Sequence, residues 1–182
     1  MQKKYKYRAF GYAGKLLLCQ IISFLATFIL MNIFNFLIPQ KAPVLSFLCG
    51  IVIFGFITYC EAWGRGEGDS NRVKIGIFKE NKLFGLLAGF LAAIPSFLIA
   101  VPAFLAESGT ASFYSVFDYD LFTMVNRMWQ LPFSVLFTYV NKTPALNFVF
   151  PLFVPFISGI GYFLGFEGIS IKQNLLYKHE SK

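Results

Sequence analysis

Leu16–Ile38 reads LLLCQIISFLATFILMNIFNFLI, and Leu83–Ala106 reads LFGLLAGFLAAIPSFLIAVPAFLA. Neither stretch contains a charged residue, and each supplies the ~20 mostly apolar residues that a helix needs to cross a bilayer. Two further stretches, Pro43–Cys60 and Leu146–Phe166, are also uncharged and of comparable length. The sequence therefore predicts an all-α membrane protein built on a bundle of four transmembrane helices.

The composition of the whole chain agrees with a lipid environment. Hydrophobic residues make up 57% of the chain and charged residues only 14%, whereas an ordinary soluble domain has about 45–50% apolar and about 25% charged residues. A globule of 20.6 kDa leaves much of its surface exposed, so it cannot hide this much apolar surface inside. We expect residues 1–182 to form a single integral membrane domain.

The basic residues between the expected spans predict the orientation of the chain. Lys and Arg concentrate in residues 1–15, 61–82 and 167–182, and are fewer in the other two connections. Because such residues favour the cytoplasmic side, we expect a multi-pass protein of a bacterial cytoplasmic membrane with both termini in the cytoplasm. The net charge of +7 also favours contact with anionic lipids of the inner leaflet. Nucleic acid is not expected as a partner, since the basic residues form no continuous stripe.

Residues 120–140 separate the third and fourth spans. Read as a helix, the first half places Leu121, Val125 and Met128 on one face, and Trp129 beside them suits the depth of the lipid headgroups. The opposite face is polar and carries Asp120, Thr123, Asn126, Arg127 and Gln130. Pro132 is expected to end the helix. We predict an interfacial or re-entrant amphipathic helix; the alternative is a fifth span, which would place the C-terminal lysines outside.

A polar stripe runs along the first span. Gln20, Ser23, Thr27 and Asn35 fall on one side of a helix with 3.6 residues per turn. Lipid offers such side chains no hydrogen-bonding partners, so the stripe is expected to face other helices or a polar cavity. Two interpretations follow: hydrogen bonds between helices, or the lining of a substrate path.

Small residues recur one turn apart in the last two spans. The third span carries Gly85 and Gly89, and the fourth carries Gly161 and Gly165. This spacing lets helix backbones approach closely in a membrane. We expect the third and fourth spans to pack against each other through these four glycines.

Most side chains capable of chemistry lie in residues 61–82, which we expect to form a charged cytoplasmic loop. The candidate residues for binding a ligand or partner are Glu61, Trp63, Arg65, Asp69, Asn71, Arg72 and Lys74. The loop matches no nucleotide-binding pattern, since no strand precedes its glycines and no Gly-Lys-Ser/Thr follows. Three interpretations of the loop follow. It could be a solvated turn that sets the topology, or a loop that docks a protein. In the third, Glu61, Glu67 and Asp69 hold a divalent cation while basic residues bind a phosphate.

Several function classes are not expected from this chain. No ionisable residue lies deep in a span, which argues against a proton-coupled pump. The only histidine, His179, lies in the C-terminal tail, so neither a metal centre nor a cofactor is expected. We expect a non-enzymatic component, either a small transporter subunit or a membrane protein that binds a cytoplasmic partner through the loop. The alternative is a membrane-embedded transferase or hydrolase that acts on a lipid-linked phosphate through the same loop.

Overall fold

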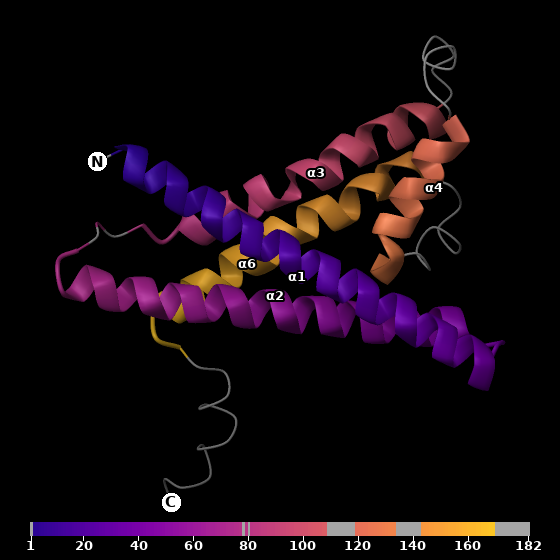
Figure 1. Ribbon diagram of the computed structural model, residues 1–182, viewed down its shortest axis with the longest axis horizontal. Coiled ribbons are helices and arrows are strands. Elements are labelled where there is room, and N and C mark those ends of the chain that lie inside the picture. Colours follow the sequence, from indigo (N-terminus) through magenta and orange to yellow (C-terminus); the bar gives the residue numbers. More distant parts are fainter. Residues whose placement is uncertain (1, 78, 80, 109–118, 134–142, 170–182) are drawn as a thin grey trace, which may run out of the picture.

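The computed structural model describes residues 2–77, 79, 81–108, 119–133 and 143–169 (Figure 1), and within these ranges the chain forms helices and no strands. The elements in chain order are α1 (Gln2–Leu37), α2 (Ala42–Lys74), α3 (Phe84–Glu107), α4 (Tyr119–Trp129), η2 (Leu131–Phe133), η3 (Pro144–Phe148) and α6 (Val149–Phe166). Four segments are long and apolar enough to cross a membrane: Tyr7–Leu37, Ala42–Lys74, Phe84–Leu105 and Pro144–Phe166. The prediction of a four-span helical bundle is confirmed, and the chain is a multi-pass membrane protein.

The four long helices pack together as one bundle (Figure 1). α3 lies along α6, α1 lies along α2, and α2 also packs on α6. The core is rich in aromatic rings, contributed by Tyr12, Phe54, Phe84, Phe133, Phe150 and Tyr162. Large apolar side chains such as Val52, Leu98 and Phe156 are exposed on the outer faces of the bundle. So much exposed apolar surface is expected where a protein meets lipid.

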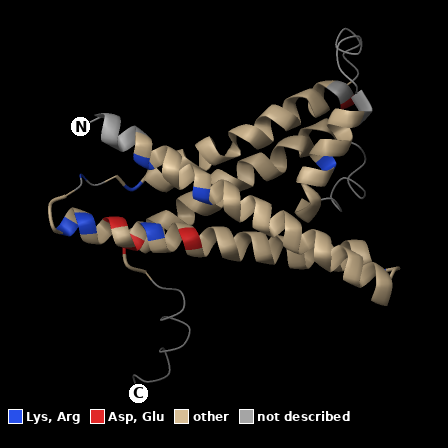
Figure 2. Ribbon diagram, in the orientation of Figure 1, with Lys and Arg blue, Asp and Glu red and all other residues tan. Residues whose placement is uncertain are grey.

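α1 and α2 are longer than a bilayer requires. They contain 36 and 33 residues, and at a rise of 1.5 Å per residue helices of this length measure roughly 50 Å, whereas the hydrocarbon core is about 30 Å thick. The excess lies at one end of the molecule, where most charged residues gather over the first turns of α1 and the last turns of α2 (Figure 2). We call this the charged end and define it by Tyr7–Lys15 of α1 and Glu61–Lys74 of α2.

The expectation of a loop over residues 61–82 was wrong for its first two thirds. Residues Glu61–Lys74 continue α2 without a break, and the chain turns only at Ile75 and Gly76, where Gly76 has a positive φ of 76°. Gly64, Gly66 and Gly68 alternate in this part of α2, and Gly66 packs closely against α6. This contact helps to hold the segment in a helix. A Cβ added at Gly66 would lie 2.8 Å from the backbone nitrogen of Phe166 in α6. Gly64 and Gly68 have no atom within 4 Å of the corresponding position.

The segment between the third and fourth spans forms α4 and then enters the bundle. α4 has 11 residues and is too short to cross a bilayer. It packs on α3 and ends before Pro132, as predicted. After it, the Phe133 ring lies against Phe54 of α2 and Phe150 of α6, with ring centroids 6.2 Å and 5.3 Å away. The additional helix predicted between the third and fourth spans is therefore present, and the chain directly after it packs in the bundle; residues 134–140 lie outside the described residues.

The two faces of α4 are oriented with the polar side inward. Asn126 and Gln130 are fully buried, whereas Leu121, Met124 and Met128 are exposed. Trp129 is partly buried and packs against the core, where its Nε1 donates a hydrogen bond to Ser96 Oγ of α3 at 2.9 Å. The apolar face of this helix is thus left for lipid, and the polar face finds its partners within the protein.

The glycines expected between the third and fourth spans serve two different interfaces. Gly85 and Gly89 of α3 do face α6, and a Cβ added at Gly89 would lie 2.5 Å from Pro155 Cα. Gly161 and Gly165 of α6 face α2 instead: a Cβ at Gly161 would lie 2.9 Å from the Cβ of Ala62. α6 therefore packs closely on both α2 and α3, through different faces.

The polar stripe of α1 is mostly turned into the protein. Gln20, Ser23 and Thr27 are buried, and Asn35 is exposed near the end of the helix. Ser23 and Thr27 donate hydrogen bonds to backbone oxygens of α1 itself. Gln20 links α1 to α3, since its Nε2 donates to Ala92 O at 3.1 Å and its Oε1 accepts from Ser96 Oγ at 3.2 Å.

Candidate functional site

The charged end is organised around Asp69. Its side chain is only 2% exposed, although it carries a charge and lies near the end of α2. Arg8 of α1 forms an ion pair with it, and Arg65 and Arg72 of α2 lie at 3.6 Å from its carboxylate oxygens. Tyr162 of α6 donates a hydrogen bond to Asp69 Oδ2 at 3.0 Å. One carboxylate therefore connects α1, α2 and α6, and its burial is compensated by opposite charges and a hydrogen bond.

An aromatic wall supports the arginines of this cluster. The rings of Tyr12, Phe84 and Tyr162 lie together, with centroid distances of 5.9 Å, 6.5 Å and 5.6 Å. The guanidinium of Arg8 lies over the Phe84 ring at 4.6 Å, and that of Arg65 over the Tyr12 ring at 5.8 Å. Cation–π contacts of this kind stabilise a cation away from bulk water. The rings thus fix the arginines in position as well as covering the carboxylate.

Further polar contacts connect the charged end to its surroundings. Lys15 of α1 pairs with Glu61 of α2 at 3.5 Å. Lys82, just before α3, pairs with Glu167 at the end of α6 at 2.7 Å. Trp63 Nε1 donates a hydrogen bond to Ile169 O at 2.9 Å. All four long helices are therefore connected at this end of the bundle.

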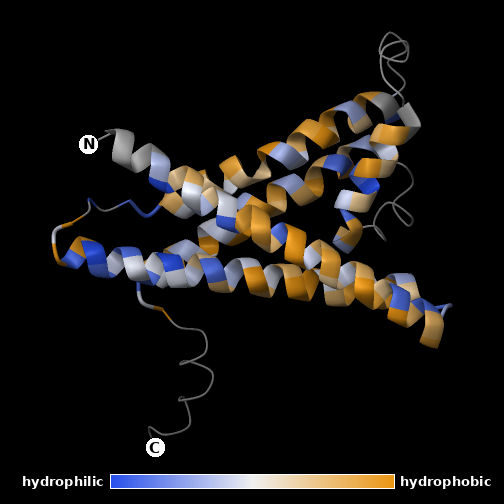
Figure 3. Cartoon of the chain, viewed as in Figure 1, coloured by the Kyte–Doolittle hydropathy of each residue, from blue (hydrophilic) through white to orange (hydrophobic). Residues whose placement is uncertain are grey.

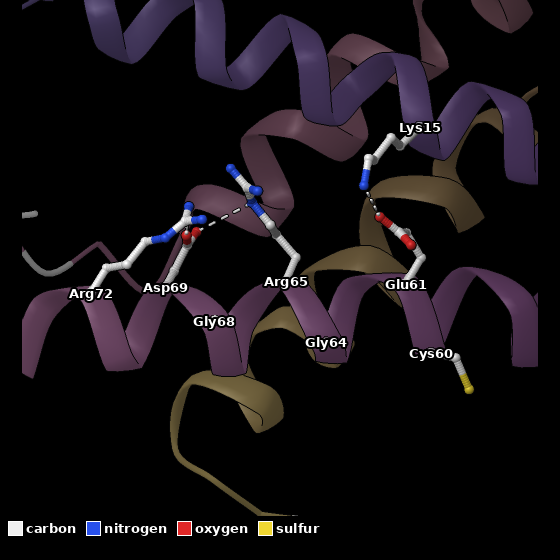
Figure 4. Close-up of a pocket in the computed structure, with 8 residues that line it drawn as sticks. All are labelled: Lys15, Cys60, Glu61, Gly64, Arg65, Gly68, Asp69 and Arg72. Carbon is white, nitrogen blue, oxygen red and sulfur yellow. Dashed lines mark ion pairs between the residues drawn. The ribbon is translucent and has the colours of Figure 1, made fainter.

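A cavity of about 280 Å³ opens between α1 and α2 at the charged end. Figure 4 shows the residues that line it: Lys15, Cys60, Glu61, Gly64, Arg65, Gly68, Asp69 and Arg72. Lys15 reaches in from α1, and the rest come from successive turns of α2. Gly64 and Gly68 give this part of α2 no side chain, which leaves the space open.

The structure brings together four of the seven residues predicted for the loop site. Glu61, Arg65, Asp69 and Arg72 line the cavity, whereas Trp63 faces the start of the C-terminal segment. Asn71 and Lys74 are exposed and lie outside the cavity lining.

Sequence reasoning missed the contributions of other helices to this site. Lys15 lines the cavity, and Arg8 and Tyr162 contact Asp69. One available signal was the seven-residue spacing of Arg8 and Lys15, which places both on one face of a helix that begins before the apolar stretch.

The acidic residues of the charged end do not gather into a metal site. Glu61 is paired with Lys15, Asp69 lies among arginines, and Glu67 is exposed. Across the described ranges, no group of three or more His, Cys, Asp and Glu side chains is close enough to hold a metal ion. The arrangement therefore gives no support to the interpretation in which Glu61, Glu67 and Asp69 share a divalent cation.

A second polar cluster secures α4 at the opposite end of the bundle. Asn126 of α4 donates to Asn147 of η3 at 2.6 Å, and Gln130 donates to Asn126 Oδ1 at 2.9 Å and to Asn147 O at 2.7 Å. Asn147 in turn donates to Glu107 of α3 at 2.9 Å, and Arg127 pairs with the same carboxylate at 3.2 Å. These buried bonds explain why α4 turns its polar face inward.

No family model matches the chain, and neither a curated protein nor a solved structure matches it. The function of the charged end is therefore inferred from its own geometry. Two carboxylates are held there by four cations, on a helix pair that continues out of the apolar spans.

Proposed function

We propose that the protein is a non-enzymatic component of a bacterial cytoplasmic membrane that docks a cytoplasmic protein at its charged end, as a transporter subunit or as part of another membrane complex. The observation that carries this proposal is the continuation of α1 and α2 beyond their apolar spans as a helix pair held by a buried ion-pair cluster. Such a pair presents side chains in fixed positions, which lowers the entropic cost of binding a partner.

The exposed face of α2 shows where the helix leaves the lipid. Val52 and Phe56 are exposed apolar residues on this face, and three turns further on it carries Glu67, Asn71 and Lys74, which are also exposed. Figure 3 shows the same change along α2, from hydrophobic residues to hydrophilic ones toward its C-terminal end. A face of this kind suits contact with water and a polar partner beyond the headgroups.

The orientation proposed for this end follows from its basic residues. Arg8, Lys15, Arg65, Arg72 and Lys74 all lie there, and Lys and Arg close to a span favour the cytoplasmic side. Both termini are then in the cytoplasm.

The enzymatic alternative has weaker support in the geometry. A transferase or hydrolase acting on a lipid-linked phosphate needs a carboxylate available as a base or as a metal ligand. Asp69 and Glu61, the two carboxylates that line the cavity, are both in ion pairs with basic residues. Their charges hold helices together, which favours a binding role for this end of the molecule.

Photocrosslinking in intact cells tests the docking proposal. A photoreactive residue replaces Glu67 on the exposed face of α2, and a matched control variant carries it at Ser108, which is exposed at the opposite end. We expect one cytoplasmic protein to be crosslinked from position 67 and not from position 108. Reversing the charge of Lys74 in the position-67 variant is expected to reduce that adduct about tenfold, because charge reversal at a docking surface costs ~1.4 kcal/mol or more. The absence of any adduct from position 67, with the protein at normal level, would contradict docking at this surface.

A further inference from the structure

The last turn of α4 lies against the polar stripe of α1. α4 runs from the end of α3 that is opposite the charged end toward α1 (Figure 1). There the Trp129 ring stacks on Phe24 of α1, with ring centroids 6.4 Å apart. Trp129 Nε1 donates to Ser96 Oγ of α3, and Ser96 in turn donates to Gln20 Oε1. The side chain of Gln20 is thus reached from α4 through one hydroxyl group.

η2 covers the next part of the stripe. Thr27 of α1 and Pro132 of η2 are both close neighbours of Gly50 in α2, since a Cβ added at Gly50 would lie 2.9 Å from the Thr27 side chain and 3.2 Å from Pro132 Cα. Gln20, Thr27 and Pro132 are all buried. α4 and η2 together therefore lie between the polar stripe of α1 and the end of the bundle opposite the charged end.

The contacts that hold α4 in this position are mostly polar. Asn126 and Gln130 are fully buried, and their hydrogen bonds go to each other and to Asn147 of η3. Gln130 Oε1 is buried and has no hydrogen-bond partner among the described residues. A hydrogen bond of this kind adds little net stability, because water makes an equivalent bond when the two partners separate. Opening this interface to water therefore costs less than opening an apolar one.

The outer face of α4 permits such a movement. Leu121, Met124 and Met128 are exposed, so this face meets lipid when α4 is in place and still meets lipid when α4 moves away from α1. One ion pair holds the rim of the interface: Arg127 of α4 pairs at 3.2 Å with Glu107 of α3, whose side chain is only 11% exposed. We call this ion pair the latch.

We propose that α4 and η2 form a gate, which moves away from α1 and α3 when the latch opens and admits water and a small uncharged polar solute to Gln20, Ser23 and Thr27. Amide and hydroxyl groups favour such a solute, because they bind it by hydrogen bonds and offer no opposite charge to an ion. The use of the gate by a solute rests on the transporter form of the proposed function. The opening itself does not depend on docking at the charged end.

Thiol labelling of the purified protein in lipid nanodiscs tests the proposal. Thr27→Cys reports the opening in a background where Cys19, Cys49 and Cys60 are replaced by alanine, because Thr27 is fully buried in the closed protein. The probe is a small, charged methanethiosulfonate, which reacts only with thiols that water reaches. We expect slow labelling of position 27. We expect about tenfold faster labelling when Glu107→Gln removes the charge of the latch, which corresponds to a shift of ~1.4 kcal/mol in the opening equilibrium.

Ser158→Cys is the matched reporter. Ser158 is also small and fully buried, but it lies between α6 and α3, where its hydroxyl donates to Gly85 O at 3.1 Å. We expect it to stay unlabelled with and without Glu107→Gln. The matched variant is Glu167→Gln, which removes a carboxylate paired with Lys82 at the charged end and is expected to leave labelling of position 27 unchanged.

Two results would overturn the gate. The first is a position 27 that stays as protected as position 158 in the Glu107→Gln protein. The second is equal acceleration at both positions or by both variants, because it would mean that the whole bundle loosens. Neither result bears on crosslinking from position 67, so the gate and the docking of a cytoplasmic protein fail separately.

Discussion

Replacing Gly66 by alanine is expected to destabilise the protein by about 3 kcal/mol, the upper range for an overpacked interior site. An added Cβ would lie 2.8 Å from Phe166 N and closer still to Tyr162 O, both backbone atoms of α6. Neither atom can move without separating α2 from α6, and this interface also contains Gly161 and Gly165. Thermal unfolding in detergent, followed by circular dichroism, measures the effect.

The neighbouring glycines provide controls, because alanine at these positions is expected to keep or increase the stability of the protein. Gly64 and Gly68 are in the same helix two residues away on either side, and a Cβ at either position meets open space. Alanine within a helix is favoured over glycine by roughly 0.5–1 kcal/mol. Gly64→Ala and Gly68→Ala are therefore expected to leave the melting temperature unchanged or raise it. Similar melting temperatures for all three variants would contradict the close packing of α2 on α6.

Asp69→Asn is expected to cost about 3–5 kcal/mol, the usual effect of removing one partner from a buried ion pair. Asparagine keeps the shape of the side chain but removes the negative charge that Arg8, Arg65 and Arg72 surround. The arginines then lose the carboxylate that offsets their mutual repulsion beside the rings of Tyr12 and Phe84. Stability in detergent should fall, and amide hydrogen exchange of Glu61–Lys74 should become faster.

Glu67→Gln is the matched control for this change. It also removes one carboxylate from the same helix, but Glu67 is exposed. Substitutions at such positions usually change stability by less than about 0.5 kcal/mol. If Asp69→Asn and Glu67→Gln proved equally mild, the buried cluster would not hold α1, α2 and α6 together.

The four spans were predictable because their signal is local. An uncharged apolar stretch of sufficient length has few alternatives to a membrane helix, and α1 and α3 contain Leu16–Ile38 and Leu83–Ala106 except for one end residue of each, Ile38 and Leu83. The two faces of α4 were predictable for the same reason, from periodicity. Which face turns inward was not, because that depends on Asn147, which lies 21 residues beyond its partner Asn126.

The helical continuation of α2 was not predictable from local sequence. Alternating glycines among charged residues are typical of a loop, and glycine weakens an isolated helix. Here the helix is stabilised by contacts with distant segments: Gly66 packs on α6, and Asp69 binds Arg8 and Tyr162, the latter 93 residues away. The spacing of Gly161 and Gly165 likewise predicts a close helix contact without specifying the neighbour, which is α2 and not α3.

The side of the membrane on which the charged end lies tests the account most directly. Single cysteines at Lys74, at the end of α2, and at Ser108, just after α3, are compared in a background where Cys19, Cys49 and Cys60 are replaced by alanine; both test positions are exposed. With an impermeant thiol reagent on intact cells, we expect position 108 to be modified and position 74 to be modified only after permeabilisation. Labelling of position 74, but not of position 108, in intact cells would place the charged end outside and contradict its proposed role in docking a cytoplasmic protein.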